Sequence, residues 1–545
     1  GGSITIRHGG NGIIPFDIGD ATTNGTAGAI ASGNVTLAPQ QSFPFTYKQD
    51  NIQIISVDAP NNSPVPPINP VDLEQPQNHV PELAVENNIP SVVVDTDVAF
   101  LENFFTNEFE NYLNISNTPI TTLAQAQSTL HQIEQTTGIK PALIYAIFVP
   151  ATVSLPSETN GNQSQQKQSQ KSTETLWQFN AQGLAERQET ALSQENSLNQ
   201  DTDELELVLV TSQGKPIRRQ IRVTRQQVLR VAQAFRSAVT NVRSNREFLV
   251  PARQLYQWLV APLEDDLQAQ NINNLTFIMD AGLRSLPLSA LRDEQGFIVE
   301  KYSVGLMPSL SLTDTRYVDV KKLDILAMGA SEFTDENPLP AVPTELSIIT
   351  DKLWQGKSIL NQSFTLENLK QARSKIPYGM IHLATHGEFQ PGKASNSYIQ
   401  LWDSKLQFNQ LRQLGWSNPP VELLVLSACR TALGDEEAEL GFAGFAVQAG
   451  VKSALASLWY VSDTGTLGLM TTFYTQLKQA PIKAEALRQT QLAMLKGQVR
   501  IQQGQLFTPA LEEGLPLPPE LVGGGNTDLS HPYYWAAFTM IGNPW

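Results

Sequence analysis

The sequence contains a single cysteine, Cys429, among its 545 residues. One cysteine excludes an internal disulfide and a zinc site built from several thiolates, so the fold must depend on its hydrophobic core. The sequence also lacks any run of eighteen apolar residues, and its start, GGSITIRHGG, lacks the charged and apolar regions of a signal peptide. We therefore expect no membrane-spanning helix. The first residue is not methionine, which we interpret as the start of a fragment of a longer protein.

Positive charge is scarce, with 37 lysines and arginines against 53 aspartates and glutamates and a formal net charge of −16. Repulsion by phosphate groups opposes binding to nucleic acid or to an anionic membrane, so we expect neither as a main partner. Eight arginines between residues 218 and 246 have few aromatic neighbours, and their spacing fits one strand face and one solvated helix face. A cationic partner is easier to accept.

Composition shifts divide the chain into four segments. Residues 1–57 hold short β-branched runs between Gly, Asn and Asp clusters, which predicts a β-rich segment. Residues 58–98 are a linker rich in Pro and Asn. Residues 99–322 form a first α/β half, interrupted at 155–203 by a Gln/Ser-rich insertion with too few large apolar side chains to fold. Residues 323–545 form a second α/β half.

The second half alternates apolar runs with helical patterns. The runs LDILAMG, GMIHLAT, ELLVLSA and KSALASLW are nearly continuous in apolar residues, and amphipathic segments such as IKAEALRQTQLAML separate them. This pattern is typical of a largely parallel sheet covered by helices on both faces. The predicted fold class is therefore a doubly wound α/β domain.

Two of these predicted strands end in chemically reactive residues. MIHLA is followed by His386 and Gly387, and ELLVLSA is followed by Cys429. Ligands bind at the carboxyl ends of parallel strands, and adjacent strands would bring the imidazole and the thiol together. His386 could then deprotonate Cys429 and later protonate the leaving amine, while the N–H groups of Gly387 and Cys429 bind the oxyanion. A lone cysteine is otherwise a small buried residue; the strand-end His-Gly favours the catalytic interpretation.

Six motifs in order resemble the CHAT family, the caspase-like peptidase domain related to separase. They are FIMDAGLRSLPLSALRD, EKYSVGLMPSLS, IHLATHGEF, LVLSACRTALGD, GFAGFAVQAGVKSALASLWYVSD and HPYYWAAFTMIGNPW, and the likeness runs from about residue 100 to 545. The resemblance implies a caspase-like fold in two halves, the first degenerate and the second catalytic. It also implies a cysteine peptidase with His386 and Cys429 as its dyad and without cofactor or metal. Ser427 and Thr431 depart from the caspase motif, so cleavage after aspartate is not expected.

Acidic residues near this site are candidates for substrate recognition. WYVSD is similar to the separase segment whose aspartate contacts an arginine, which implies that Asp463 selects a basic P1 residue. The alternative is that Asp463 is the N-cap of a helix. Asp435, Glu436, Glu437 and Glu439 follow the nucleophile and either extend an acidic cleft or form a solvated loop.

His382 and His386 are four residues apart, which on a helix would suggest metal ligands. On the predicted strand they lie about 13 Å apart, so we expect no metal site and assign His382 to the core.

Residues 1–57 resemble the end of a filamentous-haemagglutinin-type β-helix, through GGSITIRHGG and TAGAIASGNVTL. This resemblance implies a secreted or cell-surface protein with a secretion partner; a strand-rich extension of a cytoplasmic regulatory protease is the alternative. A protein or peptide substrate is the expected partner. A second hypothesis for function is a peptide-binding or scaffold module without catalysis. Autocleavage within 155–203, at Lys167 or Lys171, is a further expectation from their charge and exposure.

Overall fold

The computed structural model describes residues 98–150 and 200–545, apart from 244–245, 334–335, 510, 512 and 525, and mainly short strands before residue 98. The chain divides into two compact units, Gly1–Asn87 and Asn88–Trp545.

The first unit consists of short β-strands: β1 (Ile4–Gly9), β2 (Phe16–Ile18), β3 (Gly25–Thr26), β4 (Ile30–Ser32), β5 (Val35–Leu37), β6 (Ser42–Phe43), β7 (Tyr47–Gln49) and β8 (Ile52–Val57). β1 pairs in parallel with β8, which pairs antiparallel with β7. Ile18, Ile30, Leu37, Ile52 and Ile54 form its small core. The likeness to a β-helix end stays a prediction, and most of the predicted linker lies outside the described residues.

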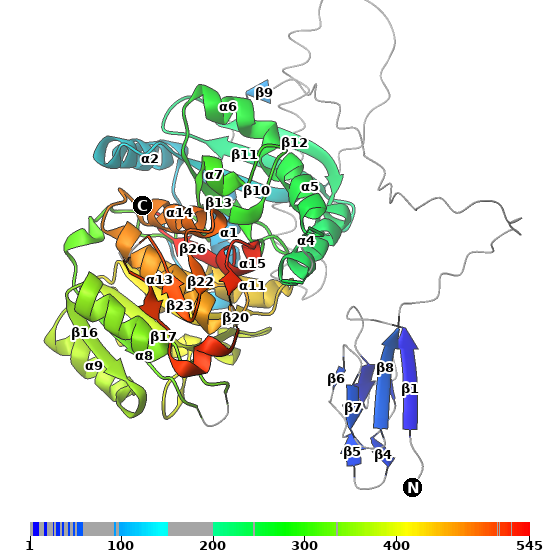
Figure 1. Cartoon of the computed structure of the whole chain (residues 1–545). Coiled ribbons are helices and arrows are strands. Elements are labelled where there is room, and N and C mark those ends of the chain that lie inside the picture. The colour runs from blue at the N-terminus through cyan, green and yellow to red at the C-terminus, as the bar shows by residue number, and fades with distance from the viewer. Residues whose placement is uncertain are drawn as a thin grey trace, which may run out of the picture. The chain divides into compact units, whose positions relative to one another are not determined.

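The second unit is organised around one long mixed sheet (Figure 1). Its strands, in spatial order, are β16 (Gly356–Leu360), β15 (Ile325–Gly329), β17 (Met380–Phe389), β20 (Leu423–Thr431), β21 (Ser453–Ser457), β26 (Phe538–Gly542), β14 (Ser303–Leu306), β13 (Asn274–Met279), β10 (Pro141–Val149), β11 (Glu204–Val210), β12 (Ile217–Thr224) and β9 (Val92–Val93). A hairpin of β18 (Tyr398–Gln400) and β19 (Lys405–Gln407) extends from β17. The strands from β16 to β21 are parallel, as are those from β26 to β10. The predicted α/β fold with a mostly parallel sheet is confirmed, whereas the predicted boundary between two halves at residues 322 and 323 stays a prediction.

Helices cover both faces of this sheet. They are α1 (Val98–Leu113), α2 (Leu123–Thr137), α4 (Arg225–Val239), α5 (Leu249–Leu259), α6 (Glu264–Ala269), α7 (Ile298–Lys301), α8 (Val342–Ser347), α9 (Leu366–Lys375), α10 (Phe408–Leu411), α11 (Glu436–Ala443), α12 (Phe445–Ala449), α13 (Asp463–Leu477), α14 (Lys483–Leu495) and α15 (Pro532–Trp535). Helix α13 packs against both α8 and α14. Helix α11 packs on β17 and β20, and α12 packs on β21 and β26. One hydrophobic core continues through both halves, from Phe109 on α1 to Ile541 on β26.

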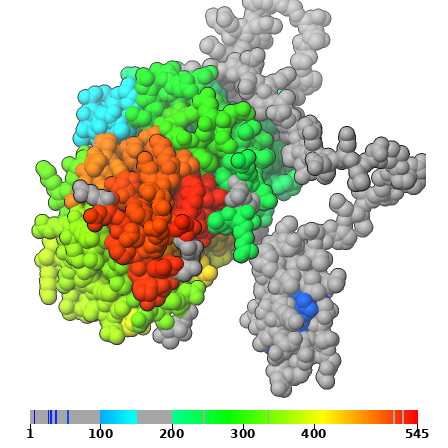
Figure 2. Space-filling model, viewed as in Figure 1, coloured from blue at the N-terminus to red at the C-terminus, as the bar shows by residue number. Residues whose placement is uncertain are grey.

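Antiparallel pairs depart from the sequence prediction in two places. β10, β11, β12 and β9 pair antiparallel at one end of the sheet, and β26 pairs antiparallel with β21 in its middle. β11 and β12 are joined by a short turn, and a short connection permits only antiparallel pairing. Strand β26, close to the end of the given sequence, occupies the middle of the sheet, and segments from α13 onward form the orange and red surface in Figure 2.

The Gln/Ser-rich insertion lies within the first half. Val149, the last residue of β10, is the register partner of Glu204, the first residue of β11, so the insertion joins the two paired ends of a hairpin. Residues 151–199, which include Lys167 and Lys171, lie outside the described residues. In the part of the chain that the structure does describe, no helix has both the length and the hydropathy needed to cross a bilayer.

Candidate active site

β17 and β20, which carry the two candidate catalytic residues, are parallel neighbours. The register pairs His386 with Ala428 and Gly387 with Cys429. Both strands continue past the ends that the sequence suggests, to Phe389 and Thr431, so the candidate residues lie inside strands rather than after them. The extension has a local cause, because β18 pairs with Gly387 and the next residue of β17 and adds backbone hydrogen bonds there.

The imidazole of His386 is in contact with two aromatic rings. Its ring lies 4.8 Å from the Phe333 ring, edge to face, and 5.9 Å from the Tyr460 ring, nearly stacked, measured between ring centres. Nε2 lies 2.7 Å from the carbonyl oxygen of Asn337. A carbonyl only accepts, so Nε2–H is the donor, and in the neutral form of the ring Nδ1 then holds the lone pair that a general base needs.

The thiol of Cys429 is fully buried, and burial raises its pKa above the ordinary value. Its Sγ lies against the backbone of Gly387, where a Cβ would come within 2.8 Å of the sulfur. The Cys429 N–H donates to Ser457 Oγ at 3.3 Å, and the same hydroxyl donates to the Cys429 carbonyl at 2.8 Å. The described state is therefore one in which the thiol is protonated and shielded.

The imidazole and the thiol are on adjacent strands but are not hydrogen-bonded to each other. Ala428, the register partner of His386, packs with Ala384 against the cluster around α8, whereas Cys429 belongs to the main core. Because successive residues of a strand point to opposite faces, His386 projects to the α8 face and Cys429 to the other. The proposed oxyanion donors, the N–H groups of Gly387 and Cys429, belong to register partners, and that of Cys429 is engaged by Ser457.

Asp463 is the first residue of α13, and the N-cap is its neighbour Ser462, whose Oγ accepts from the N–H of Gly465. The alternative that Asp463 is the N-cap is therefore wrong by one residue. Asp463 Oδ2 accepts from the N–H of Ala341 at 3.0 Å. Burial raises the pKa of Asp463 to about 6, although this hydrogen bond opposes the shift. Burial, together with the nearby Asp463 carboxylate, raises the pKa of Tyr460, whose ring stacks on His386.

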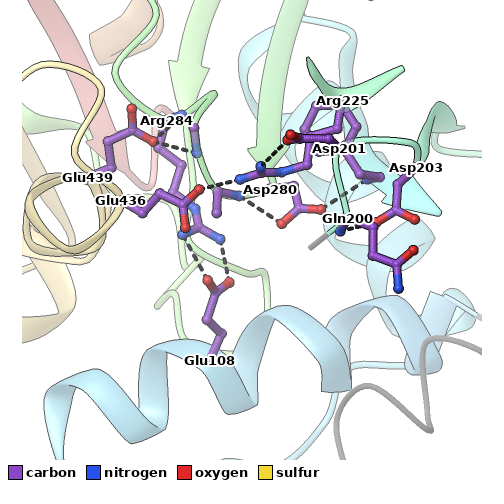
Figure 3. Close-up of polar contacts among 12 residues, drawn as sticks. Glu108, Gln200, Asp201, Asp203, Arg225, Asp280, Arg284, Glu436 and Glu439 are labelled. Carbon is purple, nitrogen blue, oxygen red and sulfur yellow. Dashed lines mark hydrogen bonds and ion pairs between the residues drawn. The ribbon is translucent and has the colours of Figure 1, made fainter. Parts of the chain in front are cut away.

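The acidic residues after Cys429 do not form one cleft. Asp435 is the N-cap of α11, where its side chain accepts from the N–H of Ala438, and Glu437 is exposed. Glu439 is fully buried against the loop after β13, and Glu436 pairs with Arg225 (Figure 3). The sequence offered an acidic cleft or a solvated loop for these residues. Neither applies to Glu439, because its side chain is fully buried and hydrogen-bonded to a distant part of the chain.

His382 lies in the core, as its position on a buried strand predicts. Its Nε2 is 2.8 Å from Glu345 and its Nδ1 is 3.1 Å from the Tyr474 hydroxyl, which links α8 to α13 below the site. Within the described ranges, no three His, Cys, Asp or Glu side chains are grouped to hold a metal ion.

Sequence reasoning missed three contributors to the site. Tyr460 stood inside WYVSD, and an aromatic residue next to a candidate specificity residue was an available signal. Ser457 and the carbonyl of Asn337 gave none, because a buried hydroxyl and a backbone oxygen are unremarkable in any sequence.

Comparisons with known proteins give one family match and several distant structural likenesses. The family model described as CHAT domain matches residues 249–543. No curated protein matches the sequence. The complex of Porphyromonas gingivalis RgpB pro- and mature domains is similar at 13% identity and a TM-score of 0.32, over 57% of this chain and 71% of that chain. The Saccharomyces cerevisiae separase–securin complex is similar at 8% identity and a TM-score of 0.40, over 81% of this chain and 33% of that chain.

Proposed function

Because the chain belongs to the CHAT domain family, we propose that it is a caspase-like cysteine endopeptidase whose catalytic residues are Cys429 and His386. The observation that supports this best is the pairing of β17 with β20, which places an imidazole and the chain's single thiol one register position apart. The tautomer fixed by the Asn337 carbonyl adds to it, since it leaves Nδ1 unprotonated.

The groups of the site have defined tasks in the proposed reaction. Nδ1 of His386 takes the thiol proton, and the thiolate of Cys429 attacks the peptide carbonyl carbon. The N–H groups of Gly387 and Cys429 bind the negative oxygen of the tetrahedral intermediate. His386 then protonates the leaving amine, and water hydrolyses the resulting thioester. No metal or organic cofactor takes part.

Catalysis requires a change from the described state, because the thiol must move to the face of the imidazole. The ladder itself suggests the movement: its inner part pairs residues 43 positions apart, as in Met380 with Leu423, and its outer part pairs residues 42 apart, as in Gly387 with Cys429. His386 and Cys429 are 43 positions apart, so continuing the inner register outward would pair them on one face.

For substrate selection we propose that Asp463 binds a basic P1 side chain. Its carboxylate is largely buried, and its only hydrogen-bond donor among the described residues is the N–H of Ala341. A guanidinium would supply the missing counter-charge through two parallel hydrogen bonds.

The test uses fluorogenic peptides that differ only at P1, carrying Arg, Lys, Asp or Leu. We expect hydrolysis of the Arg and Lys peptides and at least about a 10³-fold loss of turnover in the Cys429→Ala and His386→Ala variants, each of which should still fold. Equal hydrolysis by either variant would refute the proposed dyad. Preference for the Asp peptide would refute the role of Asp463.

A second candidate function, a peptide-binding or scaffold module without catalysis, is favoured by the buried and protonated thiol. A peptide chloromethylketone with arginine at P1 separates the two. A peptidase reacts with this probe at Cys429 far faster than free cysteine does, whereas a binding module reacts no faster.

A further inference from the structure

The segment that follows Cys429 is held by the other half of the molecule. Gly434 donates its N–H to Ser285 Oγ at 3.3 Å. Glu439, on the first turn of α11, places its carboxylate in the loop after β13, where it accepts from the N–H of Gly282 at 2.9 Å and of Arg284 at 3.3 Å. The hydroxyl of Ser285 donates to the other oxygen of the same carboxylate.

Two arginines complete this cluster around Glu439. Arg236 of α4 lies 3.5 Å from the Glu439 carboxylate and donates to the carbonyl of Gly282 and to Ser285 Oγ, each at 3.1 Å. Arg284 donates to both carboxylate oxygens of Glu108, which projects from α1 (Figure 3). Glu439 is fully buried and both oxygens of its carboxylate accept hydrogen bonds, so its side chain is rigidly held.

A second tie lies at the start of α11. Arg225, the first residue of α4, pairs with Glu436, and its other guanidinium nitrogen is 3.8 Å from Asp201. The Arg225 side chain is nearly buried, whereas that of Glu436 is half exposed. Figure 3 shows Arg225 between the two carboxylates. Arg225 therefore connects the residues before β11 to α11, the helix that follows Cys429 in the sequence.

Three of these partners precede the part of the chain that the CHAT model matches, which begins at residue 249. They are Glu108, Arg225 and Arg236. Between Cys429 and α11 lie six residues, 430–435, and their backbone is bonded at Thr431 to the Leu458 carbonyl and at Ala432 to the Phe389 carbonyl. A displacement of α11 would reach Cys429 through this short, anchored connection.

We propose that Glu439 is a positioning residue that fixes the segment after Cys429, so that residues 98–248, outside the CHAT match, control the reactivity of the Cys429 thiol. The proposal rests on the proposed function only for its consequence in catalysis. Its physical content is that releasing Glu439 loosens the outer end of β20 and opens the thiol, without general loss of the fold.

The opening of the thiol can be measured directly, because Cys429 is the only cysteine in the sequence. The rate of alkylation by iodoacetamide therefore measures the exposure of that one thiol. In the full chain we expect iodoacetamide to alkylate Cys429 at least about tenfold faster in the Glu439→Gln variant than in the parent. The carboxylate of Glu439 only accepts hydrogen bonds, whereas the amide brings N–H donors that face the N–H and O–H donors around it. Peptide turnover in the same variant should fall, with kcat changing more than KM.

Glu422→Gln is the matched control. Glu422 is equally buried, pairs with Lys452 at 2.9 Å, and stands just before β20, at the end of the strand away from Cys429. We expect this variant to lower the unfolding temperature as much as Glu439→Gln does, but to alkylate within about twofold of the parent. Equal acceleration in both variants, or acceleration in neither, would overturn the proposal.

Two milder variants keep the test decisive if Glu439→Gln does not fold. Ser285→Ala removes the hydroxyl shared by Glu439 and Gly434, and Glu436→Gln weakens the half-exposed tie to Arg225. Both should accelerate alkylation, Ser285→Ala more strongly. Alkylation of Cys429 needs no catalysis, so the two proposals can fail separately. If the parent cleaves no peptide but the variants are alkylated faster, the peptidase assignment is refuted and the positioning role of Glu439 stands. If the parent cleaves peptides but the variants are alkylated at the parent's rate, the positioning role is refuted and the peptidase assignment stands.

Discussion

Asp463 gives the sharpest prediction, because burial without a cation makes its charge costly to the folded state. The structure raises its pKa from 3.8 to about 6, chiefly through desolvation. A difference of about 2 pH units corresponds to roughly 3 kcal/mol, at about 1.4 kcal/mol per unit. Partial exposure of the carboxylate lowers this figure, so we expect about 2 kcal/mol. Asp463→Asn removes the charge and keeps an oxygen for the N–H of Ala341.

The sign of the pH dependence follows from linkage. A pKa raised on folding means that the folded state binds the proton more tightly than the unfolded state, so this contribution favours folding at low pH and is lost as pH rises from about 4 to about 6. The asparagine variant has no such dependence. We therefore expect the variant to match the parent near pH 4 and to exceed its free energy of unfolding by about 2 kcal/mol at pH 7.5.

The assay is urea unfolding of the parent and the variant at pH 4, 5, 6 and 7.5, and the quantity compared is the difference between the two at each pH, which cancels other titrating groups. Asp435→Asn is the control: Asp435 is the N-cap of α11, where asparagine caps as well as aspartate, so no such gain is expected. A destabilised Asp463→Asn variant at pH 7.5, or a difference that does not change with pH, would show that Asp463 is paired or solvated.

Two further predictions concern the residues around the dyad. Gly387→Ala places a methyl group 2.8 Å from the sulfur of Cys429, so we expect the free energy of unfolding to fall by about 1–3 kcal/mol and the alkylation rate of Cys429 to change. If neither the free energy of unfolding nor the alkylation rate changes, Sγ does not lie against Gly387. Tyr460→Ala removes the ring that stacks on His386 and should lower kcat about tenfold, whereas Tyr460→Phe keeps the ring and the rate; equal losses would point to the hydroxyl instead.

The parallel core of the sheet was predictable because its signal is local. The segments LDILAMG, MIHLA, ELLVLSA and KSALASLW became β15, β17, β20 and β21, and IKAEALRQTQLAML became α14. Near-continuous apolar runs are what strands buried on both faces require. That the strands carrying His386 and Cys429 are neighbours was a condition of the prediction and not its result, and the pairing of β17 with β20 meets that condition.

The face on which each side chain lies was not predictable. It depends on the irregularity in the ladder between Leu383 and His386, and a change of one residue in register reverses the direction of a side chain. The same limit applies to Glu439, which a sequence window presents as one of several acidic loop residues. Its partners Gly282 and Ser285 are more than 150 positions away, and no local pattern encodes such a contact.

Glu439 and Asp463 are both carboxylates withdrawn from water, yet their partners differ. Glu439 accepts from two backbone N–H groups and a hydroxyl and faces Arg236, as expected for a carboxylate with a structural task, although burial still raises its pKa. Asp463 accepts from one N–H and faces no cation among the described residues, as expected for a charge that an incoming ligand completes. If so, the ionised form binds basic substrates, and kcat/KM for an arginine peptide should rise with pH through about 6 in the parent. In Asp463→Asn that rise should be absent while a leucine peptide is unaffected; a rise at the same pH in the variant would assign it to another group, and with it the role of Asp463 would fall.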